Sequence, residues 1–278
     1  MKKISRRSFM AAAAVSVAAL ALTACGGSAS SAASSVASSA ASSEAASSAA
    51  AAELTTVEAG KLTMATNATF PPYEMTTDSG ELEGIDVDTA KAIAEKLGLE
   101  LQIDDMEFDA ALLSVQQGKA DIVMAGVTVT DERKAVMDFS DSYATGIQSI
   151  IVPNDSDIAS PDDLASKKIG TQRGTTGYIY CSDDFGEDSV VAYDSGLTAV
   201  QALNNGQVDA VVIDNAPATE YVAANPGLKV LDTSYAEEDY AIGMAKGSAL
   251  EDAVNKALEE LKADGTLQAI VDKYINAN

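Results

Sequence analysis

The chain has 278 residues, a formal net charge of −24 at pH 7 and no histidine. So acidic a protein lacks the basic surface that a nucleic acid partner requires, and we predict no nucleic acid binding. The lack of histidine removes the usual general base and the commonest zinc ligand, so we predict no enzyme activity, no metal site and no cofactor.

Residues 1–24 have the pattern of a signal peptide. A basic start precedes a short, Ala-rich apolar stretch over residues 10–22, which is too short to be a transmembrane helix. Leu22-Thr23-Ala24-Cys25 closes this stretch and resembles the bacterial lipobox, in which the cysteine is acylated and becomes the new N-terminus. An ordinary signal peptide with a chance cysteine is the alternative. SRRSFM, at residues 5–10, resembles the twin-arginine export motif, so twin-arginine and general secretory export both remain open.

From Gly26 to Ala52 the sequence is nearly all serine and alanine, with Glu44 as the only charged residue. It has no periodic apolar face that could be buried, so we predict that residues 25–53 form a flexible tether. With a lipid on Cys25, this tether would hold an acidic body at the cell membrane, on its extracellular or periplasmic face.

Beyond residue 53, segments with the period of a strand alternate with segments with the period of a helix. The predicted strands of the first half are 61–66, 99–103 and 120–126, and the predicted helices are 88–98 and 108–118. In the first helix, apolar residues recur at the i, i+3, i+4 spacing from Ala90 on, and Gly98 is a natural stop. This βαβαβ order predicts a parallel sheet with helices on its faces.

A second α/β half follows a strand at residues 147–153. Its further predicted strands are 167–172, 190–194 and 209–214, and its predicted helices are 175–185 and 196–206. Ser160 followed by Pro161 has the signature of a helix N-terminus and predicts one more helix there.

The two halves define two lobes. We predict lobe 1 over residues 54–145 and 240–278 and lobe 2 over residues 146–239. Two extended segments, near 143–150 and 239–244, would join the lobes as a two-strand hinge. Ligands of such sheets bind at the carboxyl ends of strands, so a cleft between the lobes is the candidate site.

AGVTVTDERK, at residues 125–134, lies where the third strand of the first half ends. Gly126 allows close approach, the Thr128 hydroxyl is a donor, and the Arg133 guanidinium matches a carboxylate in two parallel hydrogen bonds. The stretch therefore predicts a carboxylate site. The alternative is that Arg133 lies on the surface of a helix, paired with a neighbouring acidic residue.

Three motifs resemble those of a known family. They are GIDVD at 84–88 followed by AIA at 92–94, FPPYE at 70–74, and residues 125–134 followed by DFS at 138–140. Together they resemble the family 3 solute-binding proteins of ABC transporters, which capture polar amino acids. The resemblance covers residues 58–276 and is closest to the glutamine and basic amino acid receptors, although Thr89 stands where that family has an aliphatic residue. It implies an α/β, two-lobed fold of the type 2 periplasmic-binding-protein kind, with each lobe a mostly parallel sheet flanked by helices.

The resemblance also implies roles for individual residues. Arg133 would bind the α-carboxylate of an amino acid, helped by the backbone of Gly126, Val127 and Thr128 and by the turn at Thr175 and Thr176. Asp214 would accept the α-ammonium, and Phe70 and Phe108 would stack on the ligand side chain. As alternatives, Asp214 caps the helix that follows it, and either phenylalanine belongs to the core.

The sequence defines ligand selectivity less well. Asn67 stands where glutamine and basic amino acid receptors often have aspartate, so a cationic side chain lacks its expected counter-charge there. Gln172 is a candidate side-chain contact, and Arg173 would favour an acidic ligand unless it points to solvent. Glutamine, cystine, a basic amino acid and glutamate all remain open.

The implied function is that of the substrate-binding component of an amino acid ABC importer, which captures an L-amino acid between its lobes and delivers it to a membrane permease. We expect a monomer whose partners are the free amino acid and the permease. A periplasmic dehydratase of aromatic amino acid precursors on the same fold is one alternative, and a tethered amino acid sensor is another. Against an enzyme, Cys181 is a lone thiol that we expect to pack in its helix, and Glu237-Glu238 is predicted to be solvated surface.

Overall fold

The structure is a computed structural model that describes residues 54–275. The predicted signal peptide, the lipidation site Cys25 and the predicted tether over residues 25–53 lie outside the described residues, so those expectations stay predictions. The described residues belong to one compact unit. Within this part of the chain, no helix is both long enough and apolar enough to cross a membrane.

Lobe 1 is built on a five-stranded sheet with the order β5-β1-β6-β14-β7. Its strands are β1 (Lys61–Thr66), β5 (Glu100–Asp105), β6 (Ile122–Val123), β7 (Met137–Phe139) and β14 (Gly243–Ala245). β1 pairs in parallel with β5 and β6, whereas β14 is antiparallel to both β6 and β7. A further three-stranded sheet contains β2 (Thr69–Phe70), β3 (Glu74–Thr76) and β4 (Leu82–Glu83).

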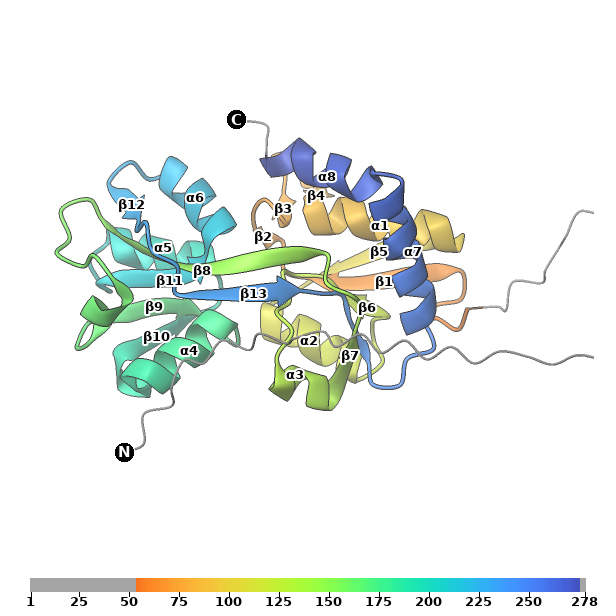
Figure 1. Cartoon of the computed structure of the whole chain (residues 1–278), viewed down its shortest axis with the longest axis horizontal. Helices are drawn as coiled ribbons and strands as arrows, with labels where there is room; N and C mark the ends of the chain where they lie inside the picture. The colour runs from red at the N-terminus through yellow and green to blue at the C-terminus, as the bar shows by residue number, and fades with distance from the viewer. Residues whose placement is uncertain (1–53, 276–278) are drawn as a thin grey trace, which may run out of the picture. The chain divides into compact units, whose positions relative to one another are not determined.

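Helices cover both faces of the five-stranded sheet, as Figure 1 shows. α1 (Ile85–Leu97), α7 (Glu251–Ala263) and α8 (Thr266–Ile275) pack together on one side, and α2 (Phe108–Gln116) and α3 (Asp131–Val136) lie on the other. Leu62 and Met64 on one face of β1 and Ala65 on the other are all fully buried. Helices cover both faces of the sheet, so β1 is buried on both faces. A strand with alternating apolar and polar residues would instead have one face exposed to solvent.

Lobe 2 is built on a six-stranded sheet with the order β10-β9-β11-β8-β12, and β13 also pairs with β8. The strands are β8 (Ala144–Pro153), β9 (Ile169–Gln172), β10 (Val190–Tyr193), β11 (Ala210–Asp214), β12 (Leu228–Val230) and β13 (Ala236–Tyr240). Its helices are α4 (Thr176–Phe185), α5 (Gly196–Asn204) and α6 (Asn215–Ala223). The predicted alternation of strands and helices is therefore present in both lobes.

Both sheets are mixed, whereas the sequence suggested mostly parallel ones. In lobe 2, β9 is parallel to β10 and β11, but β8 is antiparallel to β11, β12 and β13. The βαβ units give the parallel pairs, and the antiparallel pairs arise where the chain passes from one lobe to the other and returns. The two-lobed α/β fold itself is confirmed.

Two antiparallel strands connect the lobes. β8 and β13, both strands of the lobe 2 sheet, run side by side toward lobe 1 in Figure 1, with Ala144 paired to Tyr240 and Gln148 paired to Ala236. β8 covers most of the first extended segment that the sequence marked as a hinge, 143–150, and β13 overlaps the start of the second, 239–244. Tyr240 lies close to Gly146, where a Cβ atom would be 2.4 Å from the tyrosine ring, so only glycine fits at that position of β8.

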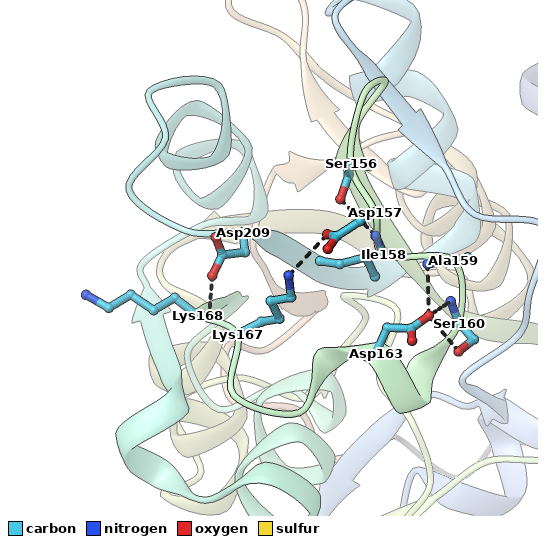
Figure 2. A network of polar contacts seen from close by, with 9 residues as sticks. All are labelled: Ser156, Asp157, Ile158, Ala159, Ser160, Asp163, Lys167, Lys168 and Asp209. Atoms are coloured by element: carbon cyan, nitrogen blue, oxygen red, sulfur yellow. Dashed lines mark hydrogen bonds and ion pairs between the residues drawn. The ribbon is translucent and has the colours of Figure 1, made fainter.

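The helix predicted at Ser160 is a single 3-10 turn, η1 (Pro161–Leu164). Figure 2 shows its capping box, in which the Asp163 carboxylate accepts hydrogen bonds from the backbone amide and the hydroxyl of Ser160, each at 2.9 Å. Ser160 followed by Pro161 predicted the start of this turn correctly. The turn does not extend into a longer helix, because β9 begins a few residues later. Lys167 pairs with Asp157 at 3.1 Å and holds the loop on either side of the turn together.

Candidate functional site

A small pocket lies between the two lobes. Lobe 1 contributes Asn67, Phe70, Glu74, Phe108, Ala125, Gly126, Thr128 and Arg133 to its wall, and lobe 2 contributes Gln172, Thr175, Thr176 and Asp214. Most of these residues lie in the loops and helix starts that follow strands at this edge of each sheet, as expected for an α/β fold.

Arg133 is a buried cation on the lobe 1 side of the pocket. It lies in the first turn of α3, where the Thr130 side chain caps the helix by accepting a hydrogen bond from the Arg133 amide. Its guanidinium donates to the Thr128 carbonyl at 2.8 Å and to the Gly174 carbonyl at 3.2 Å, and lies 5.4 Å from the centre of the Phe108 ring. The alternative of a solvated surface arginine is therefore wrong.

The guanidinium has no anionic partner in direct contact. None of the ion pairs among residues 54–275 involves Arg133, although only 8 % of the residue is exposed. Burial lowers the pKa of Arg133, and the charge of nearby Glu238 is the largest influence in the other direction. A buried cation without a paired anion is unfavourable, so a ligand carboxylate would be stabilised here.

Asp214 is the buried carboxyl group on the lobe 2 side. It ends β11 and occupies the N-cap position of α6, yet its side chain makes no capping hydrogen bond. Instead, the carboxylate accepts hydrogen bonds from the Tyr240 hydroxyl and from Gln148 Nε2, the latter at 2.8 Å. Burial raises the pKa of Asp214 to about 7. A ligand ammonium would favour the ionised form of this group.

Ten of the twelve residues predicted for the site line the pocket. The two that do not are Val127, which is fully buried in the lobe 1 core, and Arg173, whose side chain is 55 % exposed. Arg173 lies 3.7 Å from Asp194 and donates to the Ala192 carbonyl, so it faces the surface of lobe 2. Phe70 and Phe108 are buried and also form pocket wall, so the core alternative and the ligand-contact prediction are compatible for both.

Polar contacts join the lobes around the pocket. Gln172 Nε2 donates to Asn67 Oδ1 at 2.8 Å, and the hydrogen bond from Arg133 to the Gly174 carbonyl also crosses from lobe 1 to lobe 2. The Asn67 amide nitrogen in turn donates to the Met106 carbonyl at 2.8 Å. Asn67 therefore has a bridging role, which explains an amide where an aspartate was expected.

Glu74 is a pocket residue to which the sequence analysis gave no role. It is fully buried, and burial followed by the charge of Asp86 raises its pKa well above the usual value. Asp86 accepts hydrogen bonds from the Gly126 amide at 3.0 Å and from the Tyr143 hydroxyl at 2.8 Å, so it holds Gly126 in its left-handed conformation (φ 55°). Glu74 belongs to the motif FPPYE and Asp86 to the motif GIDVD, so these motifs could have identified both acids as site residues.

Glu238 corrects the prediction that Glu237-Glu238 is solvated surface. Glu237 is exposed, but only 7 % of Glu238 is exposed, and its carboxylate lies behind the pocket between Thr128 and Thr176. Alternate residues of β13 are buried, namely Glu238 and Tyr240. An alternating pattern places Glu238 and Tyr240 on the same face of a strand, which could have predicted burial of both. A charged residue is not expected at a buried position, so this pattern was missed.

Comparison with known proteins identifies the family. Residues 62–277 match the family described as "Bacterial extracellular solute-binding proteins, family 3", and the chain belongs to it. It is 33 % identical over 225 residues to the L-cystine-binding protein TcyJ of Escherichia coli strain K12, covering 80 % of this chain and 85 % of the relative. It is 33 % identical over 222 residues to the ABC transporter arginine-binding protein 1 of the same organism, covering 78 % and 91 % of the two chains.

A solved structure supports the same conclusion. The arginine-, lysine-, histidine-binding protein ArtJ of Geobacillus stearothermophilus is similar with a TM-score of 0.75 and 34 % identity, over 78 % of this chain and 96 % of that one. The family binds solutes and is not enzymatic. Cys181 agrees with this, because the thiol is fully buried and burial raises its pKa to about 12.

Proposed function

We propose that this protein is the substrate-binding component of an amino acid ABC importer and that the pocket between the lobes binds an L-amino acid. The observation that carries the proposal is the pair of Arg133 and Asp214. They are oppositely charged, buried, on different lobes and in the wall of one pocket, and they form no ion pair with each other. The two head groups of an amino acid would satisfy both.

The α-carboxylate would bind to Arg133 in the two-pronged manner that guanidinium groups favour. The start of α4 at Thr176 faces the same pocket, and the amides at a helix N-terminus stabilise an anion. The α-ammonium would bind to Asp214, and the side chain would extend along Phe70 and Phe108. This arrangement uses the residues of both lobes at once.

Capture then follows from contact between the lobes. Because Arg133 belongs to lobe 1 and Asp214 to lobe 2, the ligand gains its full set of contacts only when both lobes surround it. We propose that β8 and β13 act as the hinge, with lobe boundaries near residues 145 and 240. The ligand-bound form would then dock on a membrane permease.

A basic amino acid is the ligand that the pocket favours most. Its charged wall residues are Arg133, Asp214 and Glu74. A zwitterion matches the first two. Glu74 is a further buried acid with a raised pKa, and a cationic ligand side chain beside it would favour its ionised form. Relatives named for arginine binding and for arginine, lysine and histidine binding support this choice. Cystine is the second candidate, because the similar TcyJ is named for it.

The anchoring of the protein is also a proposal. We propose that Cys25 carries a lipid and that residues 25–53 tether the body to the outer face of the cell membrane, as a monomer. Labelling with radioactive or clickable fatty acid would mark the wild type, and Cys25→Ala would abolish the label. Label that persists in the variant would refute lipidation at this residue.

The function is tested by a thermal-shift screen with the twenty amino acids, cystine and ornithine. A true ligand at about a thousand times its Kd stabilises the folded state by about 4 kcal/mol and raises the melting temperature. Prephenate and arogenate should show no turnover. If no amino acid shifts the melting temperature or gives heat in calorimetry, the proposed function is wrong.

Arg133→Ala tests the carboxylate site directly. Leaving the ligand carboxylate without its buried partner costs on the order of 3–5 kcal/mol, which weakens the Kd roughly a hundredfold or more. Lys134→Ala is the matched control, because Lys134 is exposed on the same helix, and it should bind like the wild type. Wild-type affinity in Arg133→Ala would show that the carboxylate binds elsewhere.

A further inference from the structure

Glu238 connects the hinge to both lobes through one oxygen atom. Glu238 lies on β13, and its Oε2 accepts hydrogen bonds from Thr128 Oγ1 at 3.2 Å, from Thr176 Oγ1 at 2.9 Å and from Gln148 Nε2 at 3.0 Å. Thr128 belongs to lobe 1, Thr176 starts α4 in lobe 2, and Gln148 lies on the other hinge strand, β8. All of these contacts are buried.

The chemistry of these groups fixes the direction of each hydrogen bond. An ionised carboxylate only accepts, and a threonine hydroxyl has a single proton to donate. Gln148 Nε2 also donates to Asp214 Oδ2 at 2.8 Å, so its amide nitrogen must face both carboxylates and the amide cannot be reversed. The two hydroxyl oxygens also lie 3.5 Å from each other, but each is closer to Glu238 Oε2, so we assign both hydroxyl protons to Glu238.

Only lone pairs of these two hydroxyl oxygens remain for the pocket. Thr128 and Thr176 both line it, together with Asp214. The hydroxyls can accept a hydrogen bond from a ligand but cannot donate one to it. This arrangement differs from the expectation that the Thr128 hydroxyl is a donor, and it would leave the ligand carboxylate to Arg133 and to backbone amides.

We infer that Glu238 is a positioning residue that makes the Thr128 and Thr176 hydroxyls acceptors for the α-ammonium of the ligand, beside Asp214. The inference rests on the proposed function of the pocket. It assigns the requirement for an α-amino group to a network of four residues rather than to Asp214 alone. Because Thr128 and Thr176 lie on different lobes, the network is complete only when the lobes are in contact.

Two other roles for Glu238 make different predictions. A purely structural carboxylate would, when removed, weaken every ligand by the same factor. A carboxylate that repels the ligand carboxylate would, when removed, tighten binding. A positioning role predicts something else, namely a selective loss of affinity for ligands that carry an α-ammonium.

The test compares amino acids with analogues that lack the α-amino group. The probes are L-arginine with 5-guanidinopentanoate and L-histidine with 3-(imidazol-4-yl)propanoate, titrated by calorimetry at pH 8 into the wild type, Glu238→Ala, Glu238→Gln and Glu237→Ala. The wild type should prefer the amino acid over its analogue, and Glu238→Ala should reduce that preference at least about tenfold, which is roughly 1.4 kcal/mol. Glu237→Ala should match the wild type, because Glu237 is exposed on the opposite face of β13.

Glu238→Gln should keep the preference within about threefold of the wild type. Gln148 forces the amide oxygen, and not the nitrogen, of the new side chain toward the hydroxyls, so the acceptor is retained. If Glu238→Ala does not fold, as judged by circular dichroism, Glu238→Met fills the same space without an acceptor and carries the same prediction.

Equal weakening of both members of a probe pair, or tighter binding in the alanine or methionine variant, would overturn the inference while leaving the proposed function intact. A wild type that binds neither probe amino acid would overturn the inference, whereas the proposed function fails only if none of the amino acids in the thermal-shift screen binds.

Discussion

Replacing Asp214 by asparagine should stabilise the ligand-free protein at pH 8 while it removes ligand binding. The pKa of this buried carboxyl group is raised from 3.8 to about 7, with burial as the largest cause. Because the folded state holds the proton more tightly than the unfolded state, the stability that this group contributes is complete below about pH 4. That stability is lost as the pH rises through about 7.

The magnitude follows from the shift. About three pKa units correspond to about 4 kcal/mol at a pH well above 7. Asparagine is neutral at every pH and avoids this loss. Its amide oxygen would accept from Gln148 Nε2, so its amide nitrogen would replace the oxygen to which the Tyr240 hydroxyl now donates. One mismatched buried hydrogen bond costs about 1–3 kcal/mol of folding stability, which offsets part of this gain. We therefore expect Asp214→Asn to be more stable than the wild type by about 1–3 kcal/mol at pH 8 and by much less at pH 5.

Urea unfolding without ligand, at pH 8 and at pH 5, measures both quantities. Asp183→Asn is the matched control, because Asp183 is exposed in α4 of the same lobe, and it should change stability little at either pH. The reasoning is refuted if Asp214→Asn is less stable than the wild type at pH 8, or if its gain is the same at both values. Calorimetry on the same sample should show that amino acid binding is lost.

Two further predictions concern affinity. Because protonated Asp214 cannot pair with an ammonium group, the affinity of the wild type for an amino acid should fall roughly thirtyfold between pH 8 and pH 5.5; an affinity that is flat or rises on acidification would contradict this. Gly126→Ala should weaken binding about tenfold, because φ is 55° there and the new Cβ would lie 2.7 Å from Phe70 Cε1. Gly118→Ala has a similar φ of 65° but open space around it, so it should lower stability without changing the Kd measured by calorimetry.

Periodicity predicted most of the fold because burial repeats along each element. The stripe that starts at Ala90 and the stop at Gly98 predicted α1 and its end correctly, although α1 begins at Ile85 and not at 88. The strand expected over residues 61–66 is β1. η1 shows where this reasoning fails. Ser160 and Pro161 signal how a helix begins, but the length of the helix depends on how soon the chain must enter β9, which is a tertiary constraint.

The site was predicted where a motif is local and missed where it depends on long-range contacts. Gly126, Thr128 and Arg133 fall within a few residues of one another, so a single stretch revealed them. Glu238 contacts Thr128 across 110 positions in the sequence, and nothing near Glu238 indicates a polar partner. Arg173 was predicted wrongly for a local reason. It follows the pocket residue Gln172 in the sequence, but its side chain points away from the pocket, to the surface of lobe 2.

The central claim is that Arg133 and Asp214 bind the two head groups of one amino acid between the lobes. A crystal structure of the protein grown with the amino acid that gives the largest thermal shift tests this most directly. We predict that the α-carboxylate contacts Arg133, that the α-ammonium contacts Asp214, and that the side chain lies between Phe70 and Phe108. A ligand bound outside this pocket, or bound with its head groups reversed, would contradict the account.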